Sequence, residues 1–213
     1  MMPRTQTVLR PVALPLPAAP DTDSGGPAAA DGALTSTERA HVLELLARSE
    51  RDCLALIEPL TDAQWSSAPE GRWSVGQIVE HLGTVEANIM RLVHRMLASP
   101  PDPDWHTRTA GRDALLERIL GDRTDRITAP KSTNPAGTDD RATLVGRLRD
   151  GRAQTVAFAR DTTEPLKART FAHLAPAIGV MNGYQWLLCI ARHHDRHNDQ
   201  IRELLASGGA GPR

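Results

Sequence analysis

The chain has 213 residues, which is longer than a typical single domain but too short for two typical domains. Of these residues 40% are hydrophobic and 24% charged, as in globular proteins. Aromatic residues make up only 3%, which argues against a β-sandwich or barrel, and the net charge of −1 provides no basic field for nucleic acid or an anionic membrane. The two cysteines cannot form a disulfide framework, and the longest apolar run, Trp186 to Ala191, is far shorter than the ~18–20 residues that span a bilayer. We therefore expect a mainly helical, cytoplasmic protein that binds neither nucleic acid nor membrane.

Residues 1–32 differ from the rest of the chain because prolines recur every few positions among Ala, Gly and Asp. Proline removes a backbone donor and disfavours helical geometry in the preceding residue. The stretch from Val12 to Pro17 is too short and too rich in proline for the apolar core of a secretory signal peptide. The sequence predicts a flexible arm at residues 1–32, a helical domain at residues 33–207 and a disordered tail at residues 208–213.

Two helices are predicted in the first half of this domain. Each begins at a hydroxyl residue followed closely by Glu or Gln, which is the capping-box pattern. The two pairs are Thr35 with Glu38, and Ser74 with Gln77. Apolar residues then recur at helical spacing, up to Pro59 in the first helix and to just before Pro101 in the second. Residues 60–72, between the two helices, are predicted to form a loop.

A long connection at residues 99–139 separates the first pair of helices from the second. It holds five prolines, a polar centre and one short helical stretch at about Ala114 to Leu120. A third helix is predicted from about Arg141 to Arg160, and a fourth from about Asn182 to Ala206, ended by glycine. Four helices with a long crossover between the second and the third predict an all-α fold, a four-helix bundle.

The predicted fourth helix contains the most informative spacing in the chain. His193 and His197 lie four residues apart, on the side of the helix that also carries Trp186 and Ile190. A rise of about 6 Å and a rotation of about 40° let both imidazoles reach one ion, although locally hydrogen-bonded histidines show the same spacing. His81, at the margin of the second helix's apolar face, is the best candidate for a third ligand. Three neutral imidazoles leave an ion room for water, as in catalytic metal centres.

Several motifs in this order resemble the DinB-like superfamily, which includes the YfiT-type metal-dependent hydrolases. They are Trp73-Ser74, Glu80-His81-Leu82, a long crossover containing proline, Gly179 leading to Tyr184-Gln185-Trp186, and His193-x-x-x-His197-x-x-Gln200-Ile201. The resemblance covers about residues 36–206. It implies a four-helix bundle, usually a homodimer, in which three histidines hold a divalent metal ion, often nickel or zinc. His81, His193 and His197 fall on the ligand positions of that superfamily.

The resemblance also implies a choice of chemistry. Some members join low-molecular-weight thiols such as bacillithiol or mycothiol to electrophiles, one branch isomerises maleylpyruvate with a thiol, and many have no known activity. We therefore expect a metal-dependent enzyme that activates water or a low-molecular-weight thiol toward a small-molecule substrate, as a hydrolase or a thiol S-transferase. The alternative is a non-catalytic, metal-binding, dimeric helical protein.

Four residues near these histidines each have two interpretations. His194 also faces inward on a helical wheel, so it could replace His193 as a ligand or act as a hydrogen-bonded neighbour. Gln200 could bond a ligand imidazole, metal-bound water or substrate, or it could form a hydrogen bond between two helices. Glu86 could orient an imidazole or serve as a general base, but we expect it at the surface. Cys189 could lie near the ion, but we expect it to be a small buried residue.

Overall fold

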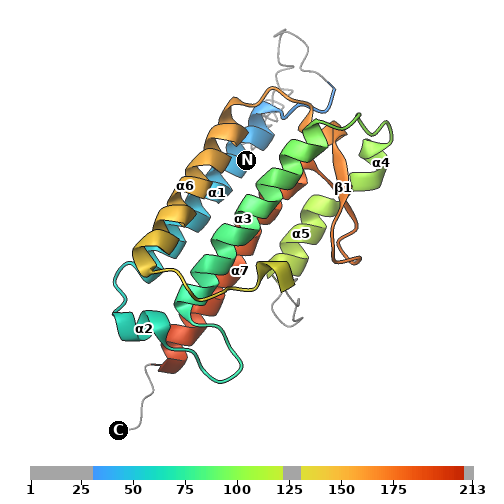
Figure 1. Ribbon diagram of the computed structural model, residues 1–213. Helices are drawn as coiled ribbons and strands as arrows, with labels where there is room; N and C mark the ends of the chain where they lie inside the picture. Colours follow the sequence, from blue (N-terminus) through green and yellow to red (C-terminus); the bar gives the residue numbers. More distant parts are fainter. Residues whose placement is uncertain (1–30, 122–130, 209–213) are drawn as a thin grey trace, which may run out of the picture.

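A computed structural model describes residues 31–121 and 131–208 (Figure 1). The predicted N-terminal arm and C-terminal tail lie almost entirely outside the described residues. The boundaries that the sequence suggests for them therefore stay predictions.

Four long helices form the body of the molecule. They are α1 (Ser36–Ile57), α3 (Val75–Leu97), α6 (Arg141–Asp161) and α7 (Gly183–Gly208). Helix α1 packs against α6 and α7, and α3 packs against the same two helices, so α1 and α3 lie diagonally opposite. Helices α1 and α7 run in one direction, and α3 and α6 run in the other (Figure 1). The predicted all-α four-helix bundle is confirmed.

The helices begin where the sequence predicts, because the capping residues are local signals. The Thr35 hydroxyl accepts a hydrogen bond from the Glu38 amide at 3.1 Å, and the Glu38 carboxylate accepts one from the Thr35 amide at 2.8 Å. Ser74 and Gln77 form the same reciprocal pair at the start of α3. Asp140 caps α6 by accepting from the backbone amide of Thr143. Each cap satisfies amides that have no partner inside the helix.

The segment predicted as a loop, residues 60–72, contains a short helix, α2 (Asp62–Ser66). Thr61 and Gln64 form a capping box of their own at its start. Trp65 then anchors this turn because its side chain is buried against the start of α3. The loop prediction was wrong here, since the same capping pattern that locates the long helices is present.

The long connection at residues 99–139 is more structured than predicted. It holds α4 (Trp105–Thr109), α5 (Arg112–Gly121) and a 3₁₀ turn, η1 (Lys131–Thr133). Helix α5 extends the predicted stretch Ala114–Leu120 at both ends, and it packs along α7 (Figure 1). The connection therefore lies against the helix that carries two of the candidate ligands.

A small hairpin precedes α7 and has no counterpart in the sequence prediction. After the 3₁₀ turn η2 (Leu166–Ala168), strands β1 (Thr170–Ala172) and β2 (Val180–Asn182) pair antiparallel, with Phe171 opposite Met181. Strands of three residues are too short to show the alternation of polar and apolar side chains that identifies a strand.

Apolar side chains fill the bundle in two separate clusters. The larger cluster lies toward the hairpin and includes Leu46, Val93 and Leu187. The smaller lies toward α2 and includes Ile57 and Leu82. Between the two clusters the interior is polar. The side chains of this polar layer are Ser49, Glu86, Arg152, His194 and Asn198, all of them buried.

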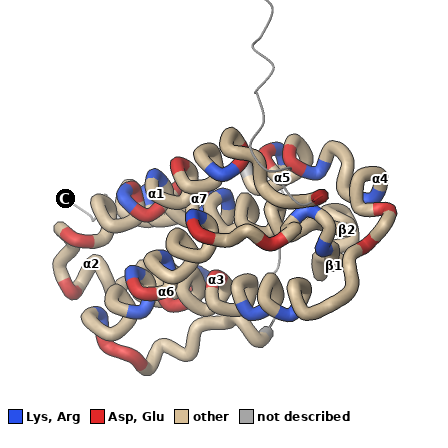
Figure 2. The backbone as a smooth tube through the Cα atoms, turned by 90° about the horizontal axis from the view of Figure 1, so that it is seen from above, with Lys and Arg blue, Asp and Glu red and all other residues tan. Residues whose placement is uncertain are grey.

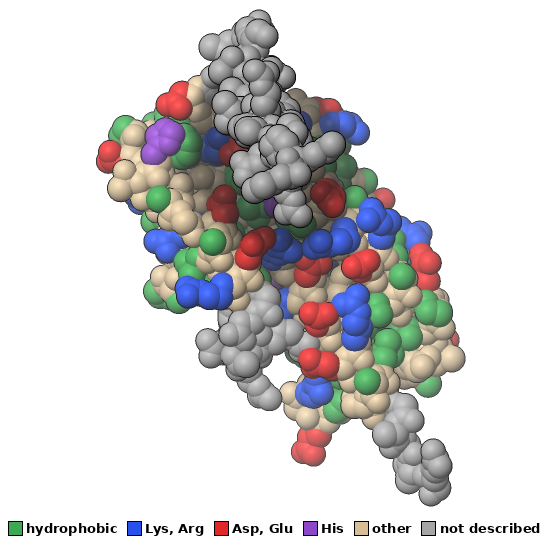
Figure 3. Space-filling model, turned by 180° about the vertical axis from the view of Figure 1, so that it is seen from behind, with side chains coloured by type: hydrophobic (Ala, Val, Ile, Leu, Met, Phe, Trp, Pro, Cys, Tyr) green, Lys and Arg blue, Asp and Glu red, His purple; other side chains and the backbone are tan. Residues whose placement is uncertain are grey.

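Charges on the outside of the molecule are mixed. Basic and acidic residues alternate along the helices in Figure 2, and on the face shown in Figure 3 they lie side by side. Ion pairs such as Arg48–Asp195 and Arg149–Glu58 join neighbouring helices. Within residues 31–121 and 131–208, no helix combines the length and the apolar character needed to cross a membrane.

Candidate metal centre

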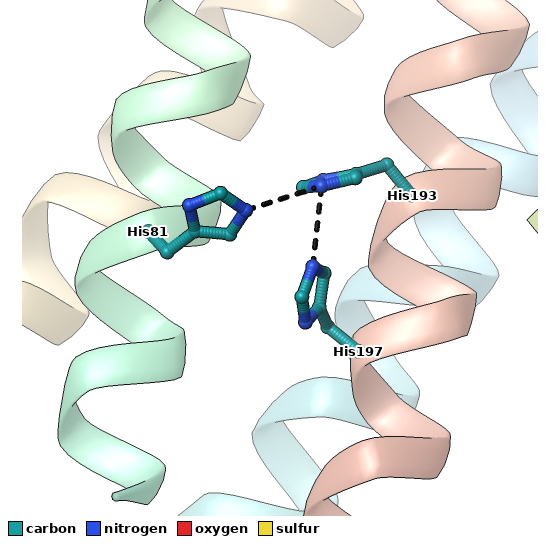
Figure 4. Close-up of side chains that lie close together, drawn as sticks. All are labelled: His81, His193 and His197. Carbon is teal, nitrogen blue, oxygen red and sulfur yellow. Dashed lines mark hydrogen bonds between the residues drawn. The ribbon is translucent and has the colours of Figure 1, made fainter. Parts of the chain in front are cut away.

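Three histidines from two helices converge inside the bundle (Figure 4). His81 comes from the second turn of α3, and His193 and His197 come from successive turns of α7. Helices α3 and α7 are antiparallel neighbours, so the early part of α3 lies beside the later part of α7. The i,i+4 spacing on α7 then places both of its imidazoles toward the same point on α3.

The nitrogen atoms that face the centre lie close together. The Nε2 atom of His193 is 3.3 Å from the Nε2 atom of His81 and 3.2 Å from that of His197. One ligand atom from each of the three rings lies within 4.8 Å of the others. Among the histidine, cysteine, aspartate and glutamate side chains of the described residues, these three histidines form the group whose ligand atoms lie close enough to share a metal ion. The convergence expected from the sequence is present.

The outer nitrogens of two of these rings are held by oxygen acceptors. The Nδ1 atom of His81 is 2.8 Å from the backbone carbonyl oxygen of Thr133, and Nδ1 of His197 is 2.8 Å from Oε1 of Gln200. Because these oxygens can only accept, each Nδ1 carries the proton and donates it. The Nε2 lone pairs of His81 and His197 therefore point into the centre. Of the roles expected for Gln200, the structure shows the contact with an imidazole, that of the candidate ligand His197.

The segment that follows Thr133 is held on α3 by a contact that sequence analysis missed. The Glu80 carboxylate, next to His81 on α3, accepts hydrogen bonds from the backbone amides of Ala136 and Gly137 at 2.8 and 2.9 Å. These bonds fix the end of the long connection on the first turns of α3. The connection thus forms one wall of the centre, as a segment of that length inside a compact domain suggests.

Burial keeps the three imidazoles neutral. It lowers the pKa of His81, lowers that of His197 to about 3, and lowers that of His193 well below its ordinary value. The neighbouring imidazoles lower the pKa values of His193 and His197 further, because two positive charges so close together would repel. At neutral pH all three rings are uncharged, and a metal ion binds the neutral form of imidazole.

The donor set fits a divalent metal ion. Two imidazole nitrogens bound to one ion at about 2.0–2.1 Å with tetrahedral geometry are about 3.3 Å apart, close to the two Nε2 separations found here. Trp73 covers His81, with the ring centroids 4.8 Å apart, and is itself half-buried. His193 and His197 are each partly exposed. The cluster could bind a metal ion and leave a coordination position open.

His194 lies outside this cluster, although it follows His193 directly. Its buried Nε2 atom is 3.1 Å from Oε2 of Glu86. Glu86 was expected at the surface, and that expectation was wrong, because only 2% of it is exposed and Arg152 holds it. Cys189 is a small buried residue, as expected, and burial raises the pKa of its thiol to about 12.

Arg152 is a buried charged residue that sequence analysis missed. It is fully buried at the centre of α6 and donates to the Glu86 carboxylate through two nitrogens. A signal for it exists in the sequence, because Arg152 continues the spacing of four that runs through the buried residues Leu144 and Leu148. A charge on an apolar stripe indicates a buried partner on another helix.

The fold and the histidine cluster together define a helical bundle with a candidate metal centre between two antiparallel helices. Residues 45–201 match the family model of the DinB superfamily, and the chain belongs to that superfamily. Among solved structures it is similar to YfiT from Bacillus subtilis, described as a probable metal-dependent hydrolase with an unusual four-helix bundle topology. The TM-score is 0.52 and the identity 19%, over 84% of this chain and 91% of YfiT, which shows a shared fold. The curated proteins searched contain no match to this sequence.

Proposed function

We propose that this protein is a metal-dependent enzyme that holds a divalent ion on His81, His193 and His197 and acts on a small-molecule substrate. The observation that carries the proposal is the convergence of three neutral imidazoles on one point, with the outer nitrogens of two of them held by oxygen acceptors. Ligand histidines in metal sites are oriented in this way by a second hydrogen bond. Membership of the DinB superfamily and the description of YfiT support the same conclusion.

The residues of the site have separate tasks in this proposal. A divalent ion bound there would supply Lewis acidity, which makes a water molecule or a small thiol a stronger nucleophile at neutral pH. Thr133 and Gln200 hold two of the imidazoles in the tautomer that offers Nε2. Trp73 packs over one side of His81, and a substrate would approach past the partly exposed rings of His193 and His197. We propose hydrolysis or thiol S-transfer as the reaction, and nickel or zinc as the ion, since imidazole suits both metals.

The test compares His81→Ala with His41→Ala, a matched substitution of an exposed histidine on α1. Each protein is stripped of metal, reloaded with Zn²⁺ or Ni²⁺, and assayed with a panel of small esters and amides and with a thiol plus a model electrophile. We expect turnover by the wild type and by His41→Ala, dependent on metal, and none above background by His81→Ala.

One result would contradict catalysis and favour the alternative function, a non-catalytic metal-binding protein. In that case no protein would turn over any substrate, while removal of the ion would lower the melting temperature of the wild type and leave that of His81→Ala unchanged. The alternative has a physical basis, because an ion shared by α3 and α7 would tie two helices together and stabilise the fold by its binding free energy.

We also propose that the protein forms a homodimer. Phe171 and Leu174, on the hairpin before α7, are large apolar side chains that are 49% and 77% exposed. Burying them between two copies would remove this apolar surface from water, which favours association.

A further inference from the structure

The interior of the bundle is interrupted by one layer of polar side chains that joins all four long helices. On each helix this layer separates residues of the larger apolar cluster from residues of the smaller one. Its members are Ser49 on α1, Glu86 on α3, Arg152 on α6, and His194 and Asn198 on α7. A buried polar layer is costly unless its groups find partners. Among the described residues, Nδ1 of His194 and Oδ1 of Asn198 have no hydrogen-bond partner, so the contacts that the other groups make are informative.

Arg152 is the centre of the layer. Its Nε and Nη2 atoms donate to the two oxygens of Glu86 at 3.0 Å each, which is a two-pronged contact between α6 and α3. Its Nη1 atom donates to the carbonyl oxygen of Leu46 and, at 3.0 Å, to the hydroxyl of Ser49, both on α1. The planar guanidinium presents these donors in a fixed fork, so the contacts hold only in one relative placement of the three helices.

Helix α7 joins the same layer through two residues. Nε2 of His194 is 3.1 Å from Oε2 of Glu86, and Nδ2 of Asn198 donates to the backbone carbonyl of Ser49 at 3.0 Å. His194 directly follows His193, and Asn198 directly follows His197. Glu86 lies five residues after His81 on α3. The layer therefore connects the two helices that carry the candidate ligands, within about two turns of those ligands.

We propose that Glu86, Arg152 and His194 are positioning residues, which set the register of α3 against α7 and so bring His81 opposite His193 and His197. Apolar packing alone does not fix this register, because it is non-directional and accepts alternative placements of similar volume. A shift of one turn moves a helix by about 5.4 Å, more than the spread of the three ligand atoms. Buried ionic groups are best attested in this registering role.

The inference rests on the proposed metal site for one of its readouts, so the test also includes a readout that needs no metal. The double variant Glu86→Leu/Arg152→Met replaces the buried pair by apolar side chains of similar size, a change that commonly leaves stability intact. Its matched control is Glu58→Leu/Arg149→Met, the same exchange at an exposed ion pair between α1 and α6. If the buried double variant does not fold, Glu86→Gln replaces it, because this substitution keeps the volume and removes the charge.

The first readout is the binding of Co²⁺, measured by titration and by its visible absorption spectrum, which reports the geometry of the ligands. Changes in the residues that orient metal ligands weaken binding about 10–100-fold, and we expect a loss of that size and an altered spectrum in the buried variant. The exposed control should match the wild type. Unchanged Co²⁺ affinity and an unchanged spectrum in a folded buried variant would overturn the inference and leave the layer a purely structural feature.

The second readout is the set of nuclear Overhauser contacts between the ring protons of His81 and those of His193 and His197, recorded in metal-free protein. In the wild type we expect contacts from His81 to both rings, since the ring centroids lie 5.1 and 4.9 Å apart. In the buried variant we expect these contacts to weaken. If the wild type binds no Co²⁺, the proposed function fails, and these contacts still decide on positioning: contacts unchanged by the double substitution would refute it.

Discussion

Glu86 illustrates how a single side chain can be misjudged from sequence and then explained by its surroundings. Burial alone would raise its pKa, but the contacts with His194 and Arg152 outweigh that effect and lower the pKa to about 2. The carboxylate therefore stays charged in the core at neutral pH. Its partner Arg152 lies on α6 and is distant in sequence, so no local pattern around Glu86 reveals the pairing.

This pKa determines how stability depends on pH. The pKa of Glu86 is near 4.5 in the unfolded chain and about 2 in the folded protein, so protonation favours unfolding. Its stabilisation is complete above the unfolded value and is lost as the pH falls toward the folded value. The lowered pKa of Glu86 corresponds to a stabilisation of the folded protein by about 3 kcal/mol at neutral pH, and we expect about 2 kcal/mol of this stabilisation to be lost by pH 3.

The measurement is urea unfolding of the wild type and of Glu86→Gln at pH 7 and pH 3, with chelator present throughout. The difference in unfolding free energy between the two proteins should shrink by about 2 kcal/mol at the lower pH. Glu58→Gln, at an exposed carboxylate, is the control and should show little change. An equal difference at both pH values would show that the contacts of Glu86 do not stabilise its charged form.

The candidate ligands could be found from sequence because their pattern is partly local. His193 and His197 have the spacing of one helix face, and His81 lies at the margin of another apolar face. The structure was needed to show that His193, and not His194, faces the centre. It was also needed to find the outer partner of His81, because Thr133 lies far from His81 in the chain. Side chains paired across helices depend on the relative placement of those helices, which spacing alone does not give.

At the level of elements, the long helices followed from their caps and apolar spacing, and the short elements did not. The hairpin before α7 has strands of three residues, and the turn of η1 has no apolar period at all. The η1 segment matters most for function because it brings the carbonyl of Thr133 to His81. Two backbone hydrogen bonds to the Glu80 carboxylate hold this segment on α3.

We expect Glu80→Ala to loosen this segment without unfolding the bundle. The loss of two hydrogen bonds at a partly exposed carboxylate should cost about 1–2 kcal/mol and should speed hydrogen exchange at the amides of Ala136 and Gly137. Metal affinity should fall up to about tenfold, because the outer partner of His81 is no longer fixed. Glu44→Ala, at an exposed position on α1, is the control. Unchanged exchange at both amides would show that Glu80 does not anchor the segment.

At the level of the whole molecule, the exposed apolar side chains of the hairpin suggest an interface between two copies. Size-exclusion chromatography with light scattering should give a dimer for the wild type at micromolar concentration. The double variant Phe171→Ser/Leu174→Ser should shift the mass toward that of a monomer, while an exchange of exposed polar residues, such as Thr107→Ser, should not. A monomeric wild type would contradict the proposed dimer and leave the metal site unaffected.

The central claim is that one divalent ion binds where α3 and α7 present three imidazoles. Anomalous diffraction from crystals of protein purified without added metal and then loaded with Zn²⁺ or Ni²⁺ tests this claim most directly. We expect one anomalous peak within about 2.0–2.2 Å of the Nε2 atoms of His81, His193 and His197. Crystals with saturating metal that show no peak between these rings would contradict the account.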